Sequence, residues 1–376
     1  MGGPGPGVLA AAMASAPSRG AARSLARPPA VRRVLQKIAG SARTHRMFER
    51  GGTVVAAVSG GPDSLCLLHS LVRLRRLLDV EPVCFHFDHR LRPGSERDAA
   101  YVRGQAEGLG VPIVVRTADS KPRRGESVEA WARVARYEAL RDVAEEVGAV
   151  AAVAHTADDQ AETVLLAILR GSGLGAVSAM KPVSRPIVRP MLEVTREETT
   201  AFCRAIRLRP RRDPMNVDPA FMRVALRRRV IPALEEALGR GVRDALVRTA
   251  ALLRADAEFL EELAAAAEPE VVERDGDDSM LRVEALRDLS PAIAGRVVRH
   301  ALLSHRVVPE AAHIEAVLGL ATSRPGASVS LPAALKAKRE RGYVRLSRPS
   351  PGPRRIGPAP RRARHRPRGD GDGVAR

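Results

Sequence analysis

A glycine-rich turn is the part of the sequence whose residue types most directly suggest chemistry. Residues 59–64 follow the apolar run Val54–Val58 and precede a helical pattern. Paired glycines let backbone N–H groups turn inward, and the N–H groups of Ser64 and Leu65 are expected at the positive end of that helix, so the turn is predicted to bind phosphate. The alternative is an ordinary strand-to-helix turn in which Ser and Asp cap the helix. The residues of the turn are Ser59, Gly60, Gly61, Pro62, Asp63 and Ser64.

An aspartate stands where a Walker A loop carries its lysine. Asp63 is followed by Ser64, and the turn contains no Gly-Lys-Ser/Thr sequence. A carboxylate repels phosphate, so bound phosphate there needs a metal bridge or arginines. Mg²⁺ is the natural choice, because it binds one or two carboxylates together with phosphate oxygens. Asp63 is therefore predicted to be a Mg²⁺ ligand.

A second acidic pair is spaced for one face of a helix. Asp159 and Glu162 are three residues apart in the segment that follows the apolar run Val150–Val153. Two adjacent carboxylates form a suitable site for an ammonium group. The alternative is structural, because acids in a first helical turn complement the helix dipole and Thr156 can be the N-cap.

Arginines and histidines complete the set of candidate site residues. Arg133 and Arg136 are also three apart, beside Trp131 and Tyr137, and a guanidinium there could hold phosphate or charge that develops on a base. A solvated or salt-bridged role is the alternative for each. A short cluster of His86, Asp88 and His89 ends a predicted strand and is expected to shape a nucleotide site; metal ligation and a buried structural role stay open.

The strongly basic composition points to a polyanionic partner. The chain has 62 basic and 43 acidic residues, a net charge of +19, and only 3% aromatic residues, which disfavours binding of single strands mainly by base stacking. Twelve of these charges lie in residues 1–33 and 348–376. The densest basic stretch between these ends is predicted to contact phosphates of a polyanionic partner, with a solvated surface as the alternative. Its candidate contacts are Arg207, Arg211, Arg212, Arg223 and Arg227.

The elements that must position these residues alternate along the chain. Apolar runs predict strands, helical patterns lie between them, and this alternation indicates a doubly wound parallel α/β sheet with its ligand at the carboxyl ends of the strands. The predicted strands are Val54–Val58, Val83–Phe87, Val111–Val115 and Val150–Val153. The predicted helices are Asp63–Leu78, Gly94–Leu109, Ser127–Val147, Ala157–Arg170 and Leu192–Ile206.

Five segments are predicted along the chain. Residues 1–33 form a disordered basic leader, with a transit peptide as the alternative. Residues 34–235 form the α/β domain and 236–283 a helical linker, in which Val242–Ala267 is one long amphipathic helix and Glu268–Asp278 an acidic connection. Residues 284–347 form a small α+β domain that ends in a hairpin of Ser328–Leu331 and Lys338–Leu346, and 348–376 form a disordered tail.

The cysteines and the hydropathy pattern limit the class of protein. The three cysteines, Cys66, Cys84 and Cys203, are far apart and contain no CxxC pair, which favours a reducing compartment, and a cytoplasmic location is expected. No run of 18 apolar residues is present, so no membrane partner is expected.

The ordered motifs resemble a known family. The turn resembles the SGGxDS signature of the N-type ATP pyrophosphatases, and the later motifs resemble those of the tRNA(Ile)-lysidine synthetases over about residues 30–347. These motifs are His86–Arg92, Glu129–Tyr137, Ala154–Thr163, Leu169–Gly173, His313-Ile314 and Pro325-Gly326. Arg90 stands where the family usually has glycine.

The resemblance implies a reaction and a set of roles. L-lysine would be joined to C2 of the wobble cytidine in the CAU anticodon of tRNA(Ile), after ATP adenylates the C2 oxygen, with release of pyrophosphate and AMP. ATP and Mg²⁺ would bind at residues 59–64, Asp159 and Glu162 would bind the lysine, and His155 would join the cluster at His86 in shaping the nucleotide site. The resemblance assigns catalytic roles to Asp63, Arg133, Asp159 and Glu162. It also makes the polyanion a tRNA, so that the candidate contacts of the basic stretch become tRNA contacts. A homodimer is left open.

Three rival classes give different expectations. A tRNA thiolase of the same superfamily needs paired cysteines or an iron–sulfur site. Synthetases of GMP, asparagine or NAD need a glutaminase module or a different substrate domain. An RNA-binding protein that kept the fold without catalysis would not need Asp63, Asp159 and Glu162, which are all present.

Overall fold

The computed structural model describes residues 28–91, 94–211, 222–239 and 241–348. It divides into two compact units, Met1–Ala257 and Glu258–Arg376. The predicted tRNA contact Arg212, most of the leader and nearly all of the tail lie outside the described residues. Among the helices that the structure describes, no helix is long and apolar enough to cross a membrane.

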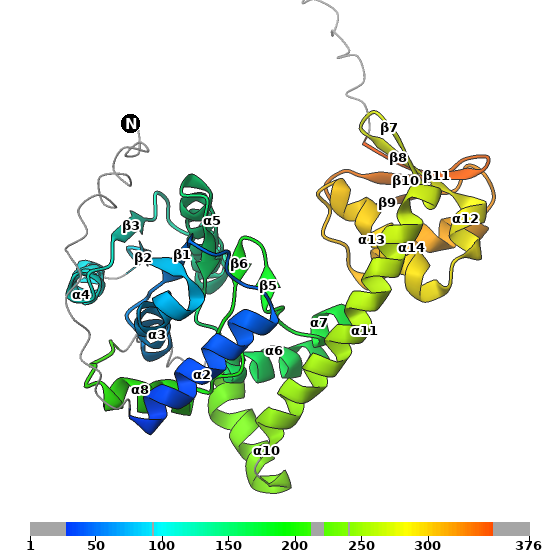
Figure 1. The fold of residues 1–376 in the computed structure, drawn as a ribbon. Coiled ribbons are helices and arrows are strands. Elements are labelled where there is room, and N and C mark those ends of the chain that lie inside the picture. The colour runs from blue at the N-terminus through cyan, green and yellow to red at the C-terminus, as the bar shows by residue number, and fades with distance from the viewer. Residues whose placement is uncertain (1–27, 92–93, 212–221, 240, 349–376) are drawn as a thin grey trace, which may run out of the picture. The chain divides into compact units, whose positions relative to one another are not determined.

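The first unit is built on a six-stranded sheet in the order β3-β2-β1-β4-β6-β5 (Figure 1). All neighbouring strands are parallel except β5, which is antiparallel to β6. This confirms the predicted doubly wound parallel sheet. The strands are β1 (Gly52–Ala57), β2 (Val80–Asp88), β3 (Ile113–Thr117), β4 (Val150–Ala152), β5 (Val183–Ser184) and β6 (Ile187–Val188).

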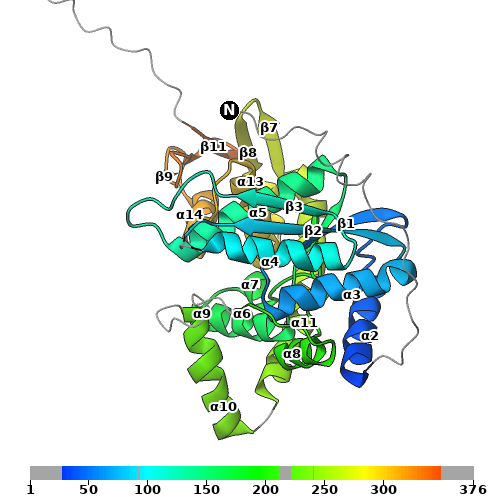
Figure 2. The same ribbon diagram turned by 90° about the vertical axis from the view of Figure 1, so that its left-hand side faces the viewer.

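Helices cover both faces of this sheet. Helices α2, α3, α4 and α8 contribute to a core on one face, and α5 packs on the other face against residues such as Val55 and Phe85 (Figure 2). A central parallel strand is buried on both sides, which is why β1 and β2 read as continuous apolar runs. The helices are α2 (Pro29–Thr44), α3 (Pro62–Leu78), α4 (Ser95–Gly108), α5 (Val128–Glu146), α6 (Ala157–Leu169), α7 (Leu174–Val177) and α8 (Arg196–Ala205).

The structure corrects the end of the predicted leader. Helix α2 begins at Pro29, and Val31 and Val34 are buried in the core beside α3. Residues 29–33 therefore belong to the folded domain, because their apolar side chains repeat at helical spacing despite the arginines between them.

The predicted helical linker is only partly helical. It contains the end of α10 (Ile231–Leu238) and all of α11 (Val242–Val271), which crosses the boundary between the two units, but its last residues form strands. The acidic connection at 268–278 was wrong: its residues finish α11 and form β7 (Val272–Asp275), which turns through Gly276 into β8 (Asp278–Arg282). Glu273, Asp275 and Asp277 are exposed on this hairpin, while Val271 and Leu281 are buried.

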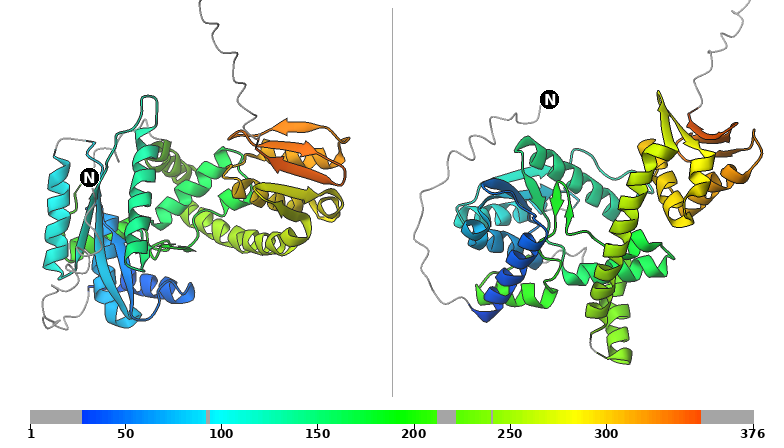
Figure 3. Two further views of the ribbon diagram at one scale, coloured as in Figure 1. Left: turned by 90° about the horizontal axis from the view of Figure 1, so that it is seen from above. Right: turned by 45° about the vertical axis from the view of Figure 1, so that its right-hand side comes forward.

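The second unit is a small α+β domain, as predicted. Its antiparallel sheet has the order β7-β8-β11-β10-β9, with helices packed against it (Figure 3). The predicted start at residue 284 is too late, because β7 and β8 belong to this sheet, and the predicted hairpin is in fact three strands, with Gly342 between the last two. The remaining elements are α12 (Val283–Asp288), α13 (Pro291–Ser304), α14 (Ala311–Thr322), β9 (Ser328–Ser330), β10 (Lys336–Arg339) and β11 (Tyr343–Ser347).

Candidate active site

The glycine-rich turn leaves the carboxyl end of β1 and leads into α3. Gly60 has φ +88°, a backbone conformation that residues with a side chain rarely adopt, so glycine is the residue that fits here without strain. The Ser64 hydroxyl lies inside the turn, where the Ser59 N–H donates to it at 3.1 Å and it donates to the Gly61 carbonyl at 3.0 Å. The turn is thereby held in one shape.

One predicted amide of this turn is not available. The Leu65 N–H donates to the Gly61 carbonyl at 3.0 Å as the first bond within α3. The N-cap is Gly61 and Pro62 has no N–H, so the amides at this helix end without an intrahelical partner are those of Gly61, Asp63 and Ser64. Leu65 was therefore a wrong choice, and Ser64 stays a candidate for phosphate.

Asp63 is held by two residues of α8 that the sequence analysis missed. The buried Thr199 hydroxyl donates to Asp63 Oδ1 at 2.5 Å, and Arg196 Nε lies 3.7 Å from Oδ2. Burial raises the pKa of the Asp63 carboxyl above its usual value, although Thr199 and Arg196 oppose this rise. No sequence motif marks Thr199 or Arg196, because their partner is 136 or 133 residues away.

Asp159 and Glu162 lie on one face of α6, as predicted from their spacing. Both accept from the Arg196 guanidinium: Nη2 contacts Asp159 Oδ1, and Nη1 lies 2.5 Å from Glu162 Oε1. Glu162 is 1% exposed and also accepts from Arg227 Nε at 2.8 Å. Arg196 thus brings together three carboxylates from two helices, Asp63 of α3 and the α6 pair.

The capping alternative for Asp159 is also present. Its Oδ2 accepts from the backbone N–H of Thr156 at 2.8 Å, and the Thr156 hydroxyl receives the Asp159 N–H at 3.4 Å. Burial raises the pKa of Asp159, but Arg196, His155 and Thr156 outweigh it and hold the pKa below its usual value. One oxygen therefore caps the helix while the other faces the site, so the two interpretations are compatible.

Arg227 lies in the site rather than among exposed basic residues. It is in the π-helical turn Leu226–Val230, and its guanidinium is half-buried against Glu162. Glu162 is 65 residues away in the sequence, so no local pattern indicated this partner, and the tRNA contact of Arg227 stays a prediction. Arg223 is half-buried in α9 (Met222–Ala225), and Arg207 is exposed at the end of α8.

Arg211 lies beside the glycine-rich turn. Its backbone N–H donates to the Gly60 carbonyl at 2.9 Å, and its guanidinium lies 5.4 Å from the Tyr101 ring centroid. The Arg211 side chain is 45% exposed, and its Nε lies 3.7 Å from Asp98 Oδ1. This basic side chain is therefore positioned at the mouth of the turn.

The cluster at the end of β2 makes contacts that hold the ends of neighbouring strands, and its role in shaping a nucleotide site stays a prediction. Buried His86 donates from Nδ1 to the Val58 carbonyl at 2.8 Å, which ties the ends of β2 and β1 together. Asp88 accepts from the Arg90 N–H at 2.9 Å, and Arg90 has φ +49°, a conformation that favours glycine. The His89 ring packs edge-on against Phe87. In the described parts of the chain, no group of three or more His, Cys, Asp or Glu is arranged to hold a metal.

A group of basic and aromatic side chains, from α5 and from the residues after β4, lies around Tyr137. Arg133 and Arg136 of α5 lie 4.9 and 5.7 Å from the Tyr137 ring centroid, and the Tyr137 hydroxyl lies 3.4 Å from His155 Nε2. Arg133 is exposed and Arg136 half-buried. Burial, with the arginines nearby, lowers the pKa of His155 to about 3, although Asp159 raises it, so this histidine is neutral at pH 7.

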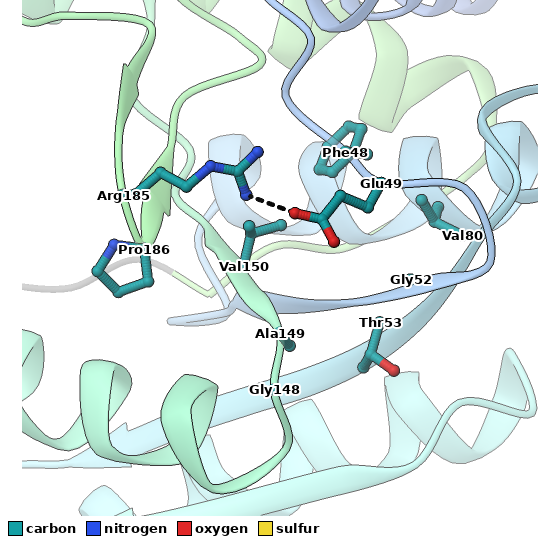
Figure 4. Close-up of a pocket in the computed structure, with 10 residues that line it drawn as sticks. All are labelled: Phe48, Glu49, Gly52, Thr53, Val80, Gly148, Ala149, Val150, Arg185 and Pro186. Atoms are coloured by element: carbon teal, nitrogen blue, oxygen red, sulfur yellow. Dashed lines mark ion pairs between the residues drawn. The ribbon is translucent and has the colours of Figure 1, made fainter.

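A pocket of about 390 Å³ lies at the opposite edge of the sheet. It is lined by the first residues of β1, β2 and β4, such as Gly52, Val80 and Val150, and by a Glu49–Arg185 ion pair of 3.6 Å (Figure 4). The glycine-rich turn and the three carboxylates are at the carboxyl ends of the strands, so this pocket is separate from the candidate site.

Comparison with known families agrees with this arrangement. Residues 30–234 match the family described as a PP-loop domain, and residues 281–345 match the TilS substrate binding domain. The solved U34-tRNA thiolase NcsA from Methanococcus maripaludis, with its [4Fe-4S] cluster, has a TM-score of 0.52 and 15% identity, and the match covers 60% of this chain and 79% of that chain. This likeness shows the fold alone.

Relatives of known name are much more similar in sequence. The tRNA(Ile)-lysidine synthase of Salinispora arenicola (strain CNS-205) is 40% identical over 317 residues, which cover 80% of this chain and 92% of that protein. The enzyme of the same name from Streptomyces coelicolor is 40% identical over 299 residues, 77% of this chain and 84% of that protein. On this similarity over most of both sequences, the chain belongs to the tRNA(Ile)-lysidine synthase family and is an ATP-using ligase of that type.

Proposed function

We propose that this ligase joins L-lysine to C2 of the wobble cytidine in the CAU anticodon of tRNA(Ile). The observation that carries the proposal is the convergence of Asp63, Asp159 and Glu162 at the carboxyl edge of the sheet, beside the glycine-rich turn. Arg196 contacts both Asp63 of the turn and the acid pair, which supports one site in which the turn would hold phosphate and the acids an ammonium group. Lysidine would change codon reading from AUG to AUA and charging from methionine to isoleucine.

The chemistry requires two steps. The C2 oxygen of cytidine is a poor leaving group, so ATP first adenylates it and pyrophosphate leaves. The lysine ε-amine then attacks C2, and AMP carries the oxygen away. The turn at residues 59–64 would hold the triphosphate, and N–H groups at the start of α3 would offset charge that develops on pyrophosphate.

Asp63 fits a Mg²⁺ ligand. Mg²⁺ in nucleotide sites takes one or two carboxylates and completes its shell with phosphate oxygens and water, so one aspartate beside the turn is sufficient. Asp63 is only partly exposed and is fixed at Oδ1 by Thr199, which leaves Oδ2 facing Arg196 at 3.7 Å. When bound, Mg²⁺ would neutralise phosphate charge. The chain's contribution is to present this carboxylate in one orientation.

The acid pair fits the amino groups of lysine. Glu162 is almost fully buried, and a buried carboxylate needs cationic partners, which Arg196 and Arg227 supply in the structure. A lysine ammonium would enter the same charge network. The carboxylates can also receive the proton that the ε-amine must lose as it attacks C2.

The rival thiolase chemistry lacks its sulfur ligands. Cys66, Cys84 and Cys203 are all buried, and burial raises the pKa of each thiol, to about 12 for Cys84 and Cys203. Thiols of this kind behave as small core residues rather than nucleophiles or cluster ligands. This favours the amine nucleophile of lysine over sulfur.

The test is a labelling assay. The protein is incubated with radiolabelled lysine, ATP, Mg²⁺ and a tRNA(Ile) transcript with the CAU anticodon, and label on the tRNA is counted. We expect label that depends on ATP, and none on a transcript whose wobble cytidine is replaced by uridine. Absence of label from folded protein would overturn the proposal.

Two features of the wider setting are part of the same proposal. We expect the enzyme to act in the cytoplasm, where its tRNA substrate and reduced thiols are found. A homodimer stays open, and the oligomeric state can be measured by light scattering.

A further inference from the structure

Four arginines surround one tyrosine on the α5 side of the sheet. The guanidinium carbons of Arg133, Arg136 and Arg141 lie 4.9, 5.7 and 5.8 Å from the Tyr137 ring centroid. Arg189, the residue after β6, interacts electrostatically with Tyr137 and donates from Nη1 to the Lys181 carbonyl at 2.7 Å. Residues from α5 and from the end of β6 therefore meet at the carboxyl edge of the sheet.

The positive charge of these four arginines is not balanced by carboxylates nearby in the described part of the chain. Within the described residues, none of the four arginines forms an ion pair with a carboxylate. The acid nearest to His155, Asp159, is already bonded to Arg196 and Thr156. Burial and the neighbouring arginines lower the pKa of Arg136 and of Arg189, which is the expected response of cations held together without an anion.

Two nitrogens in this group are buried without a hydrogen bond. In the described structure, Arg189 Nε and His155 Nδ1 have no partner, while His155 Nε2 lies near the Tyr137 hydroxyl. A buried donor without an acceptor is costly, and such groups are usually satisfied by a ligand or water. An anion with several oxygen atoms would satisfy the free donors and offset the charge at once.

We propose that Arg136, Tyr137, His155 and Arg189 form a phosphate-binding site for a backbone phosphate of the RNA substrate. This inference rests on one part of the proposed function, namely that the substrate is an RNA. Phosphate fits because guanidinium groups bind its oxygens in pairs. Exposed Arg133 and Arg141 border the group, so a polymer can reach it from solvent.

The site is distinct from the glycine-rich turn. That turn leads into α3, whose side chains pack in the core on one face of the sheet, whereas α5 packs on the other face. A phosphate held by α5 and the ends of β4 and β6 is therefore a different one from a phosphate held at residues 59–64. This separation favours RNA over the triphosphate as its source.

The experiment measures tRNA binding and ATP use in the same variants. Arg136→Gln and Arg189→Gln are prepared separately, with Arg103→Gln, an exposed arginine of α4, as the matched control. The Kd for unmodified tRNA(Ile) is measured at several salt concentrations, and the KM for ATP in saturating tRNA. We expect Kd to rise about tenfold, the salt slope to fall by about one, and the KM for ATP to stay within about twofold.

The outcomes are decisive in both directions. An unchanged Kd and salt slope in both variants, or a KM for ATP that rises while tRNA binding stays normal, would overturn the proposal. If one variant fails to fold, judged by circular dichroism, the other variant carries the test, and Arg189→Lys should recover the salt slope. Binding is read without lysidine formation, so a wild-type protein that binds tRNA but forms no lysidine would refute the proposed function alone.

Discussion

At the scale of single residues, Asp63 is the group on which the first step of the proposed reaction would depend. Its carboxylate is oriented by Thr199 and lies near Arg196, and burial raises its pKa. An amide keeps the shape of this side chain but cannot bind a cation as a carboxylate does.

We predict that Asp63→Asn abolishes pyrophosphate release and leaves the Kd for tRNA near normal. Pyrophosphate is measured with a coupled assay and tRNA affinity by filter binding. Asp142→Asn, an exposed acid of α5, is the control and should behave as wild type. Wild-type pyrophosphate release in Asp63→Asn would remove this residue from the mechanism.

Arg196 compensates the charge of three carboxylates, so its removal should destabilise the folded chain. Arg196→Gln leaves Glu162 with Arg227 alone, and we expect the free energy of unfolding to fall by about 2–3 kcal/mol. Urea denaturation measures the change. The double variant Arg196→Gln with Glu162→Gln should recover part of the loss, because the buried charge is removed as well. Additive losses would show that the two residues do not interact.

His155 should make stability depend on pH. Its pKa is about 3 in the folded chain against 6.5 as the ordinary value. Between these values the unfolded chain binds a proton that the folded chain does not, so the free energy of unfolding should fall as pH is lowered through this window. Thermal unfolding at pH 7 and pH 4 tests this. His155→Gln should show a smaller difference than wild type, and an equal difference would contradict the assignment.

At the scale of elements, α8 holds the site together. Its first turn contains Arg196, whose backbone N–H donates to Asp158 at 2.8 Å, and the Ala157 N–H of α6 donates to the Val194 carbonyl just before α8. The starts of α6 and α8 are thereby joined, and each begins with a capping box, at Thr156 and Thr195. Strong caps fix where both helices begin, which fixes the direction of the acids and of the guanidinium.

The conformation of the glycine-rich turn gives a prediction at this scale. Gly60→Ala places a Cβ at φ +88°, near Tyr101 and Val102, and should cost about 1–2 kcal/mol of stability and raise the KM for ATP. Gly104→Ala in α4 is the control, since its Cβ would meet no atom within 4 Å and alanine favours helix. A KM for ATP unchanged in Gly60→Ala would separate the turn's shape from ATP binding.

At the scale of the whole molecule, charge is concentrated at the ends of the sequence. Residues 349–376 contain eight arginines and two aspartates. Arg348 itself donates to the His305 carbonyl at 2.6 Å, so it belongs to the folded second unit and should be kept.

We predict that removal of residues 349–376 lowers the salt dependence of tRNA binding without loss of lysidine formation at low salt. Each phosphate contact that the segment makes adds about 0.7–0.9 to the slope of log K against log salt. Filter binding at several salt concentrations measures the slope. An unchanged slope would mean that these arginines do not contact tRNA.

The sequence by itself was sufficient for much of the architecture. Apolar runs and helical spacing located β1, β2, α3 and α5 to within a few residues, because a doubly wound sheet buries its central strands on both faces. The two-residue strands β5 and β6 were too short to give a pattern, and the β7–β8 hairpin was hidden by its acids.

The sequence likewise predicted only part of the candidate site. Local motifs determined the glycine-rich turn and the shared face of Asp159 and Glu162, because both depend on residues a few positions apart. Only the tertiary structure decided what these groups contact: Thr199 and Arg196 reach Asp63 across more than 130 residues, and Arg227 forms an ion pair with Glu162. Burial is the physical reason, since a carboxylate removed from water must be paired with a cation, and which cation reaches it depends on how the helices pack.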